Sequence, residues 1–138
     1  MENNTNLASE FYVASILWRL GFDVSITLGH TKEVDLFARR NGVNVVIDVK
    51  ATRGGPFLVQ TRLEQKYSFA EETKAFYIFV YWKKDFSSIK KNPTCFIVPS
   101  KELERFKRPI EKWKNKTSDV LPSALKEFEG RWDLLEKD

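Results

Sequence analysis

The stretch VDLFARRNGVNVVIDVK, residues 34–50, contains the strongest fold signal in the chain. Asn41-Gly42 is a turn pair preferred in two-residue β-hairpins, because both positions of that turn need a positive φ. The flanking segments, residues 34–39 and 43–50, are rich in Val, Ile and Phe and are therefore predicted as strands. The sequence thus predicts an antiparallel hairpin at this point.

The register of this hairpin gathers charged side chains on one face. If Asn41-Gly42 forms the turn, paired positions sum to 83, so Asp35 is predicted opposite Asp48, and Lys50 shares their face. Two facing carboxylates repel each other, so a compensating cation is expected beside them. The other face is predicted to be apolar and to hold Val34, Leu36, Ala38, Val45, Ile47 and Val49.

A third acidic residue, Glu10, lies in a helix predicted over residues 6–20, which Gly21 ends. At about 100° per residue, Glu10 falls in the middle of the apolar face of this helix. A buried carboxylate is costly unless it is paired, protonated or bound to a cation. Glu10 is therefore predicted either to join Asp35 and Asp48 or to pair with an Arg or Lys in the core. The apolar residues around it are Leu7, Phe11, Val13, Ala14, Leu17 and Trp18.

Carboxylates and a lysine in this arrangement are suited to phosphodiester hydrolysis. Oxygen ligands favour Mg²⁺, with Mn²⁺ as a possible substitute. A bound metal polarises a phosphoryl oxygen and acidifies water, and an ammonium group stabilises the developing charge. The alternative for Asp48 and Lys50 is a surface ion pair at the edge of a hairpin.

The remaining pattern predicts an α/β fold. Further strands are predicted over residues 22–27, 76–82 and 94–98. A second helix is predicted over residues 62–72, and short helices are expected over the ranges 101–116 and 123–135. The order gives a mixed sheet with the first helix on one side.

The composition excludes several classes of protein. Apolar residues make up 42% of the 138 residues, which predicts a single globular domain, 1–138. The lone Cys95 and the lone His30 are too few for a zinc site or a disulfide scaffold, and no G-x-S-x-G motif accompanies the histidine. The longest apolar run, residues 75–82, is too short to span a bilayer, and no signal peptide is visible. We therefore expect a cytoplasmic protein that does not associate with membranes.

Positive charge is concentrated in residues 83–116, which hold 11 basic and 4 acidic residues, or +7 within a chain of net charge +4. Aromatic residues are interleaved with this basic flank. The pattern predicts either contact with nucleic acid or a solvated helix face over a buried apolar stripe. In the loop after Lys50, Thr52 and Arg53 are candidate phosphate contacts, unless the loop is a simple connector. On the next helix, Arg62 and Lys66 are weaker candidates.

The motifs resemble those of the PD-(D/E)xK nuclease superfamily. Val34-Asp35 looks like its first motif, with Val where Pro often stands, and Asp48-Val49-Lys50 looks like its second motif. The helical Glu10 also matches. The resemblance implies a restriction-endonuclease-like mixed β-sheet flanked by helices, with an α-β-β-β-α-β core over about residues 6–98. Residues 99–138 would form a C-terminal helical extension outside the resemblance.

The resemblance also implies roles for individual residues. Asp35 and Asp48 would be metal ligands, Lys50 would lie beside the attacking water, and Glu10 would be an auxiliary ligand or organise water. A Gln or Lys of the next helix often assists in such nucleases. The candidates for that place are Gln60, Gln65 and Lys66.

Among its subgroups, the chain looks most like small archaeal Holliday-junction resolvases and intron- or defence-associated nucleases. The implied function is Mg²⁺-dependent cleavage of nucleic acid, most simply by a DNA endonuclease acting as a homodimer. Two alternatives stay open at this point. One is a non-catalytic nucleic-acid-binding or protein-interaction module on the same fold, and the other is an RNA-cleaving effector.

Overall fold

The structure is a computed structural model that describes residues 2–27, 34–59, 73–110 and 117–136. The helix and the strands of the larger sheet are α1 (Glu2–Arg19), β1 (Asp23–Ile26), β2 (Leu36–Arg40), β3 (Val43–Thr52), β5 (Thr73–Tyr81) and β6 (Thr94–Pro99). The smaller sheet contains β4 (Phe57–Val59), β7 (Arg108–Pro109) and β8 (Ser118–Val120). Short 3-10 helices are η1 (Lys83–Asp85), η2 (Ser100–Arg105), η4 (Pro122–Phe128) and η5 (Trp132–Leu135).

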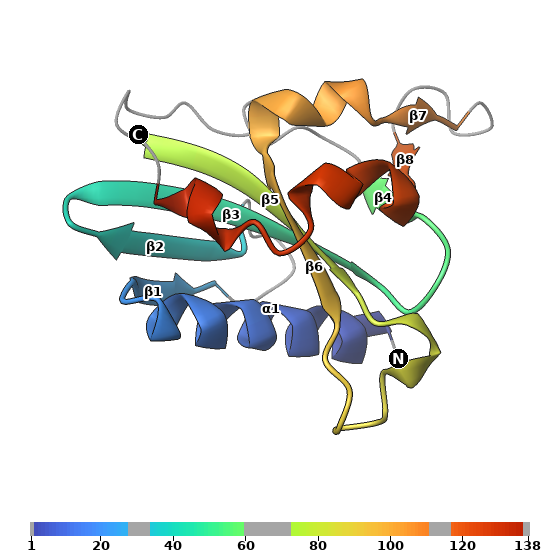
Figure 1. The fold of residues 1–138 in the computed structure, drawn as a ribbon, viewed down its shortest axis with the longest axis horizontal. Helices are drawn as coiled ribbons and strands as arrows, with labels where there is room; N and C mark the ends of the chain where they lie inside the picture. The colour runs from blue at the N-terminus through green and yellow to red at the C-terminus, as the bar shows by residue number, and fades with distance from the viewer. Residues whose placement is uncertain (1, 28–33, 60–72, 111–116, 137–138) are drawn as a thin grey trace.

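The larger sheet has the strand order β1-β2-β3-β5-β6. Its β3–β5 pair is parallel and its other pairs are antiparallel, so the sheet is mixed, as predicted. Helix α1 lies along one face, and η2, η4 and the smaller sheet lie on the other side (Figure 1). No described helix has the length and hydropathy of a membrane span.

The predicted hairpin is confirmed. Asn41 and Gly42 have φ values of 51° and 79°, which are the left-handed conformations that this turn requires. The pairing runs from Arg40 with Val43 to Leu36 with Ile47, so paired positions sum to 83 as predicted. The turn chemistry therefore sets the register in which β2 and β3 pair.

Two apolar cores lie on opposite faces of the larger sheet. The first is between α1 and the sheet, and the second is between the sheet and the C-terminal segments. Burial of these side chains supplies the main driving force for the fold. Members of the first core include Val13, Leu17, Leu36, Ile47, Val49 and Ile78. Members of the second include Val34, Val46, Tyr77, Phe79, Leu103 and Phe128.

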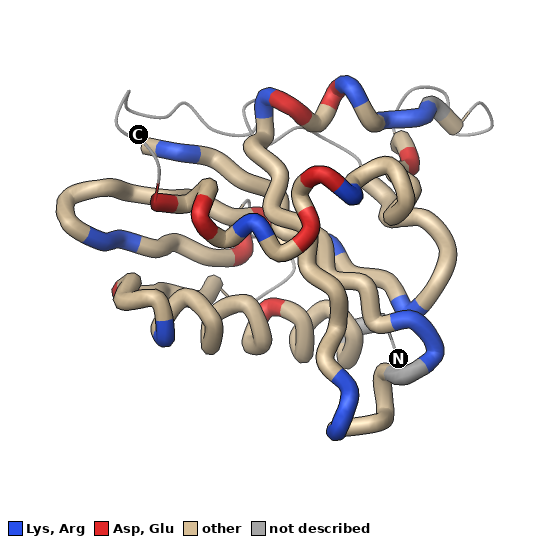
Figure 2. The backbone as a smooth tube through the Cα atoms, viewed as in Figure 1, with Lys and Arg blue, Asp and Glu red and all other residues tan. Residues whose placement is uncertain are grey.

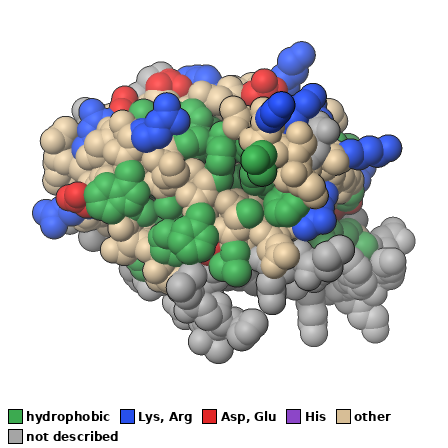
Figure 3. Space-filling view, turned by 90° about the horizontal axis from the view of Figure 1, so that it is seen from below, with side chains coloured by type: hydrophobic (Ala, Val, Ile, Leu, Met, Phe, Trp, Pro, Cys, Tyr) green, Lys and Arg blue, Asp and Glu red, His purple; other side chains and the backbone are tan. Residues whose placement is uncertain are grey.

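Part of the apolar face predicted for α1 is exposed. Leu7, Phe11 and Trp18 are 41%, 52% and 54% exposed, whereas Val13 and Leu17 are fully buried. The buried side of the helix is therefore rotated toward two small polar residues near its start, Thr5 and Ser9, which are buried. Figure 3 shows the hydrophobic side chains gathered on the face of the molecule that α1 forms.

The C-terminal segment differs from the two α-helices that were predicted there. Pro109 interrupts the first range, because proline cannot continue a helix, and Arg108–Pro109 forms β7 instead. Gly130, at a φ of 65°, separates η4 from η5 in the second range. The helix predicted over residues 62–72 lies outside the described residues.

Candidate active site

Asp48 and Lys50 lie on the same face of β3, as predicted. Their neighbours Ile47 and Val49 belong to the core beneath α1, so alternation directs Asp48 and Lys50 to the opposite face. Asp48 is only 4% exposed. Lys50 Nζ lies 3.5 Å from Asp48 Oδ2, which provides the cation expected beside this buried carboxylate.

The backbone becomes irregular at Asp35. Its N–H donates a hydrogen bond to the carbonyl of Ile47 (3.1 Å), although Ile47 is also the partner of Leu36 in the ladder. Val34 packs in the second core and Leu36 in the first. The prediction that Val34 and Leu36 share one apolar face was therefore wrong, because the chain breaks its alternation at Asp35, as at a β-bulge.

This irregularity places the Asp35 side chain beside β3. Asp35 Oδ2 accepts a hydrogen bond from the N–H of Val49 (2.7 Å), the residue that follows Asp48. The backbone N–H groups that join strands point sideways, in the plane of the sheet. The Asp35 carboxylate therefore takes the place of the carbonyl that a neighbouring strand would offer to Val49. On its other side, Thr27 holds the Asp35 carbonyl through its N–H (2.9 Å) and its Oγ1 (3.1 Å). The sequence assigned Thr27 only to a strand end and gave no sign of this role.

Glu10 is buried, as predicted, with 4% of its surface exposed. The residue before it, Ser9, links the helix to the C-terminal end of β3, because Ser9 accepts a hydrogen bond from Trp82 Nε1 (2.8 Å) and the Trp82 N–H bonds to the Thr52 carbonyl. Glu10 thus approaches this end of β3 from the α1 side. Asp35 lies beside β3 through its bond to Val49, and Asp48 lies on the face of β3 that points away from the first core. That Glu10 joins these two aspartates stays a prediction.

The donor set is suited to a hard cation. Within the described part of the chain, no three His, Cys, Asp or Glu side chains are grouped as a ready-made metal site. Mg²⁺, however, usually keeps several waters and binds proteins through one or two carboxylates, and the adjoining Asp35 and Asp48 match that requirement. Burial raises the pKa of Cys95 to about 12, so this thiol is a poor ligand and nucleophile.

The predicted substrate contacts in the loop after β3 make internal bonds. Thr52 Oγ1 accepts a hydrogen bond from the Gly54 N–H (3.1 Å). Arg53 Nε donates to Thr5 Oγ1 (2.8 Å), and its guanidinium lies 4.0 Å from the centre of the Phe86 ring. Both residues therefore shape the loop. The other predicted positions lie outside the described residues: Gln60, Arg62, Gln65 and Lys66.

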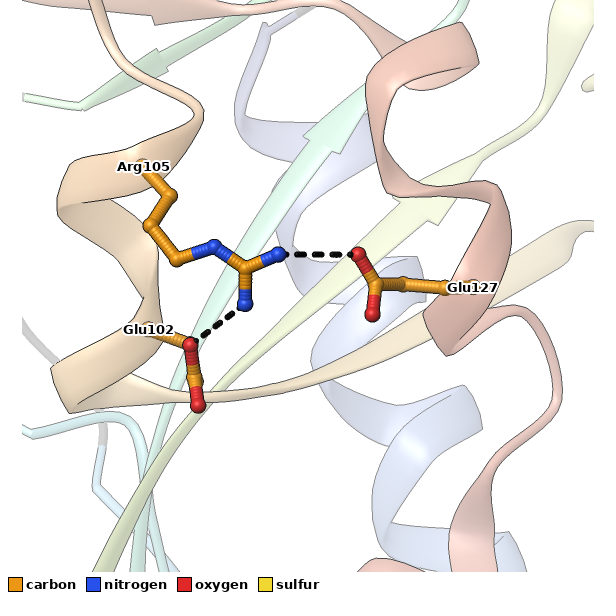
Figure 4. Close-up of polar contacts among 3 residues, drawn as sticks. All are labelled: Glu102, Arg105 and Glu127. Atoms are coloured by element: carbon orange, nitrogen blue, oxygen red, sulfur yellow. Dashed lines mark hydrogen bonds and ion pairs between the residues drawn. The ribbon is translucent and has the colours of Figure 1, made fainter.

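The arginines of the basic flank that the structure describes form ion pairs. Arg105 bridges Glu102 (2.7 Å) and Glu127 (3.4 Å) from two different segments (Figure 4). Arg108 forms a bidentate ion pair with Asp119, in which its Nε and Nη2 donate to the two carboxylate oxygens at 2.7 and 2.9 Å. These arginines tie the C-terminal segments together. Of the interleaved aromatic residues, Phe106 packs edge-on against Phe128, which favours a core role for it, and Trp113 lies outside the described residues.

No family model and no curated protein sequence matches the chain. Several solved structures share its fold, among them a resolvase and a homing endonuclease. Hjc, a Holliday junction resolvase from the archaeal hyperthermophile Archaeoglobus fulgidus, is similar with a TM-score of 0.66 at 15% sequence identity, over 96% of this chain and 97% of Hjc. The bacterial homing endonuclease I-Ssp6803I is similar with a TM-score of 0.56 at 12% identity, over 95% of this chain and 88% of that one. The chain therefore has the restriction-endonuclease-like fold that its sequence motifs implied.

Proposed function

We propose that the chain is a metal-dependent endonuclease that hydrolyses phosphodiester bonds in DNA. The observation that carries this proposal is the pair of buried carboxylates at adjoining positions, with Asp35 bonded to the N–H of Val49 and Asp48 beside Lys50 Nζ. The similarity to the folds of a Holliday junction resolvase and a homing endonuclease supports the same activity.

In this mechanism Asp35 and Asp48 hold Mg²⁺ or Mn²⁺, and Glu10 is an auxiliary ligand or accepts a hydrogen bond from water. The bound metal supplies a Lewis acid and an acidified water. Lys50, held by Asp48, places its ammonium group beside the attacked phosphate and stabilises the charge that develops there. Contacts of Thr52 and Arg53 with the phosphate backbone remain a prediction.

The direct test is metal binding measured together with cleavage. Calorimetry with Mn²⁺ or Mg²⁺ alone is expected to show binding, and the metal is expected to stimulate cleavage of branched, single-stranded or duplex DNA. Excess EDTA should remove the activity. A purified protein that binds neither cation would contradict the proposal and favour a non-catalytic nucleic-acid-binding or protein-interaction module. Cleavage of RNA alone would identify an RNA-cleaving effector.

We also propose that the nuclease acts as a homodimer, because one small active site cuts one strand at a time. The exposed apolar side chains of Leu7, Phe11 and Trp18 on α1 support self-association, since monomers rarely expose large apolar patches without a function. Light scattering is expected to give twice the 16.1 kDa mass of the chain. A monomer mass at every protein concentration, with and without DNA, would show that the active species is not a dimer.

A further inference from the structure

The connection between β5 and β6 combines exposed positive charge with an exposed apolar tip. Ile89 is 97% exposed, far more than any other large hydrophobic residue among those described. No ion pair of the described residues includes the four lysines of this connection, in contrast to Arg105 and Arg108. Figure 2 shows basic stretches here near the start of α1, whereas basic and acidic residues alternate along η2. The four exposed lysines are Lys83, Lys84, Lys90 and Lys91.

This connection, which we name the β5–β6 loop (residues 82–93), is held in place at its tip and at its base. At the tip, the Lys91 N–H donates to the Ser88 carbonyl (2.9 Å), which closes a turn with Ile89 and Lys90 at its corners. At the base, Trp82 is anchored to α1 and β3 through the hydrogen bonds described above. Its ring also packs edge-on against Phe86, with the ring centres 5.1 Å apart. An anchored loop presents its tip with less entropy to lose on binding.

The β5–β6 loop also begins close to the candidate active site. Phe79 of β5 pairs with Lys50, and Tyr81, the last residue of β5, pairs with Thr52. The loop therefore starts three residues beyond the level of Lys50, or about 10 Å along the strand. This distance is about three base steps of a nucleic-acid strand. A phosphate backbone that follows β5 from the level of Lys50 would therefore arrive at the base of the loop.

We propose that the β5–β6 loop binds the nucleic acid beside the cleaved phosphate, with its lysines on phosphates and Ile89 against a base. This inference rests on the proposed function. Apolar side chains that contact bases enter between base steps, which must first be unstacked. A gap or branch already exposes a base face, so Ile89 favours an interrupted duplex over an intact one.

Anionic lipid is the rival partner for a lysine-rich loop with an apolar tip. Nucleic acid is favoured because the loop continues β5, the strand that pairs with β3 at Lys50, where a phosphodiester is expected, and because its tip is a single compact turn. A membrane-binding segment of comparable strength usually presents a whole apolar helix face. Sedimentation with phosphatidylserine vesicles therefore belongs in the same experiment.

The experiment measures DNA affinity in metal-free buffer, so that binding is separated from cleavage. The substrates are a labelled duplex and the same duplex with a central gap. The loop variants are Ile89→Ala and the double change Lys90→Gln/Lys91→Gln, and the matched control is Lys101→Gln/Lys126→Gln at exposed lysines of η2 and η4. Because all five positions are exposed, folding is expected to persist.

Ile89→Ala is expected to weaken binding to gapped DNA about tenfold, with a smaller effect on intact duplex. The double lysine variant should weaken binding to both, and lower the slope of log affinity against log salt by about 2. The control pair should lower affinity and slope much less. The proposal is overturned if the loop variants bind as the wild type does, if the control pair loses as much, or if the loop supports only vesicle binding. Wild-type protein that binds no DNA would instead contradict the proposed function itself.

Discussion

Replacing Asp48 by Asn is expected to abolish cleavage, with a loss in rate of about 10³-fold or more. The change keeps the size of the side chain but removes the charge that lies beside Lys50 and is proposed to bind the cation. A metal contributes several kcal/mol of transition-state stabilisation, and each 1.36 kcal/mol is tenfold in rate. Single-turnover cleavage at saturating DNA measures the loss. Metal calorimetry should show weaker binding of Mn²⁺ by the same variant.

Affinity for DNA in metal-free buffer is expected to stay close to that of the wild type, since the change removes a negative charge from the site. The matched control is Glu104→Gln, which removes an exposed carboxylate from η2, where it pairs with Lys107. That variant should cleave normally. Thermal melting of both variants shows whether the fold persists. A folded Asp48→Asn protein that cleaves at the wild-type rate would rule out Asp48 as a metal ligand and with it the proposed mechanism.

The hairpin of β2 and β3 could be predicted because its information is local. The Asn41-Gly42 pair accepts few backbone conformations, and that turn fixes every pairing from Arg40–Val43 inward. The same register then predicts which face Asp48 and Lys50 share. The environment of a residue in a separate segment could be predicted only where the sequence pattern was strong, as for the burial of Glu10 in the apolar face of its helix.

The irregularity at Asp35 could not be predicted, because it depends on the residue at which β2 stops pairing with β3. Sequence alternation alone carries Val34 onto the face of Leu36, whereas the tertiary structure moves Val34 into the second core. The three short strands β4, β7 and β8 were missed for a similar reason. Two or three residues have no detectable period, and β4 and β8 pair with each other although they lie far apart in the sequence.

Exposure and ion pairing also depend on tertiary contacts. The apolar face of α1 is wider than the contact it makes with the sheet, so the sequence could not show that Phe11 and Trp18 stay exposed. The basic flank looks uniform in the sequence. The structure divides it into arginines such as Arg105 that are paired with acids and lysines around Ile89 that have no acidic partner among the described residues.

Changes at Asp35 can separate its charge from its structural role. Its Oδ2 accepts a hydrogen bond from the buried N–H of Val49 at 2.7 Å. An Asn side chain retains a carbonyl oxygen that can accept this bond but carries no charge. Asp35→Asn is therefore expected to lose about 10³-fold in cleavage, as for Asp48→Asn, with a free energy of unfolding close to that of the wild type.

Asp35→Ala removes both the charge and the acceptor. The Val49 N–H is then left without its partner beside a buried strand, which costs about 1–3 kcal/mol in the free energy of unfolding. Denaturant titration and single-turnover cleavage on the two variants therefore give a clear comparison. If Asp35→Asn cleaves normally while Asp35→Ala is unstable, Asp35 only shapes the end of β2 and the cation must be held by Asp48 and Glu10. If both variants are inactive and only the alanine variant is destabilised, the carboxylate charge itself is required, and the hydrogen bond to Val49 serves to hold that charge beside Asp48.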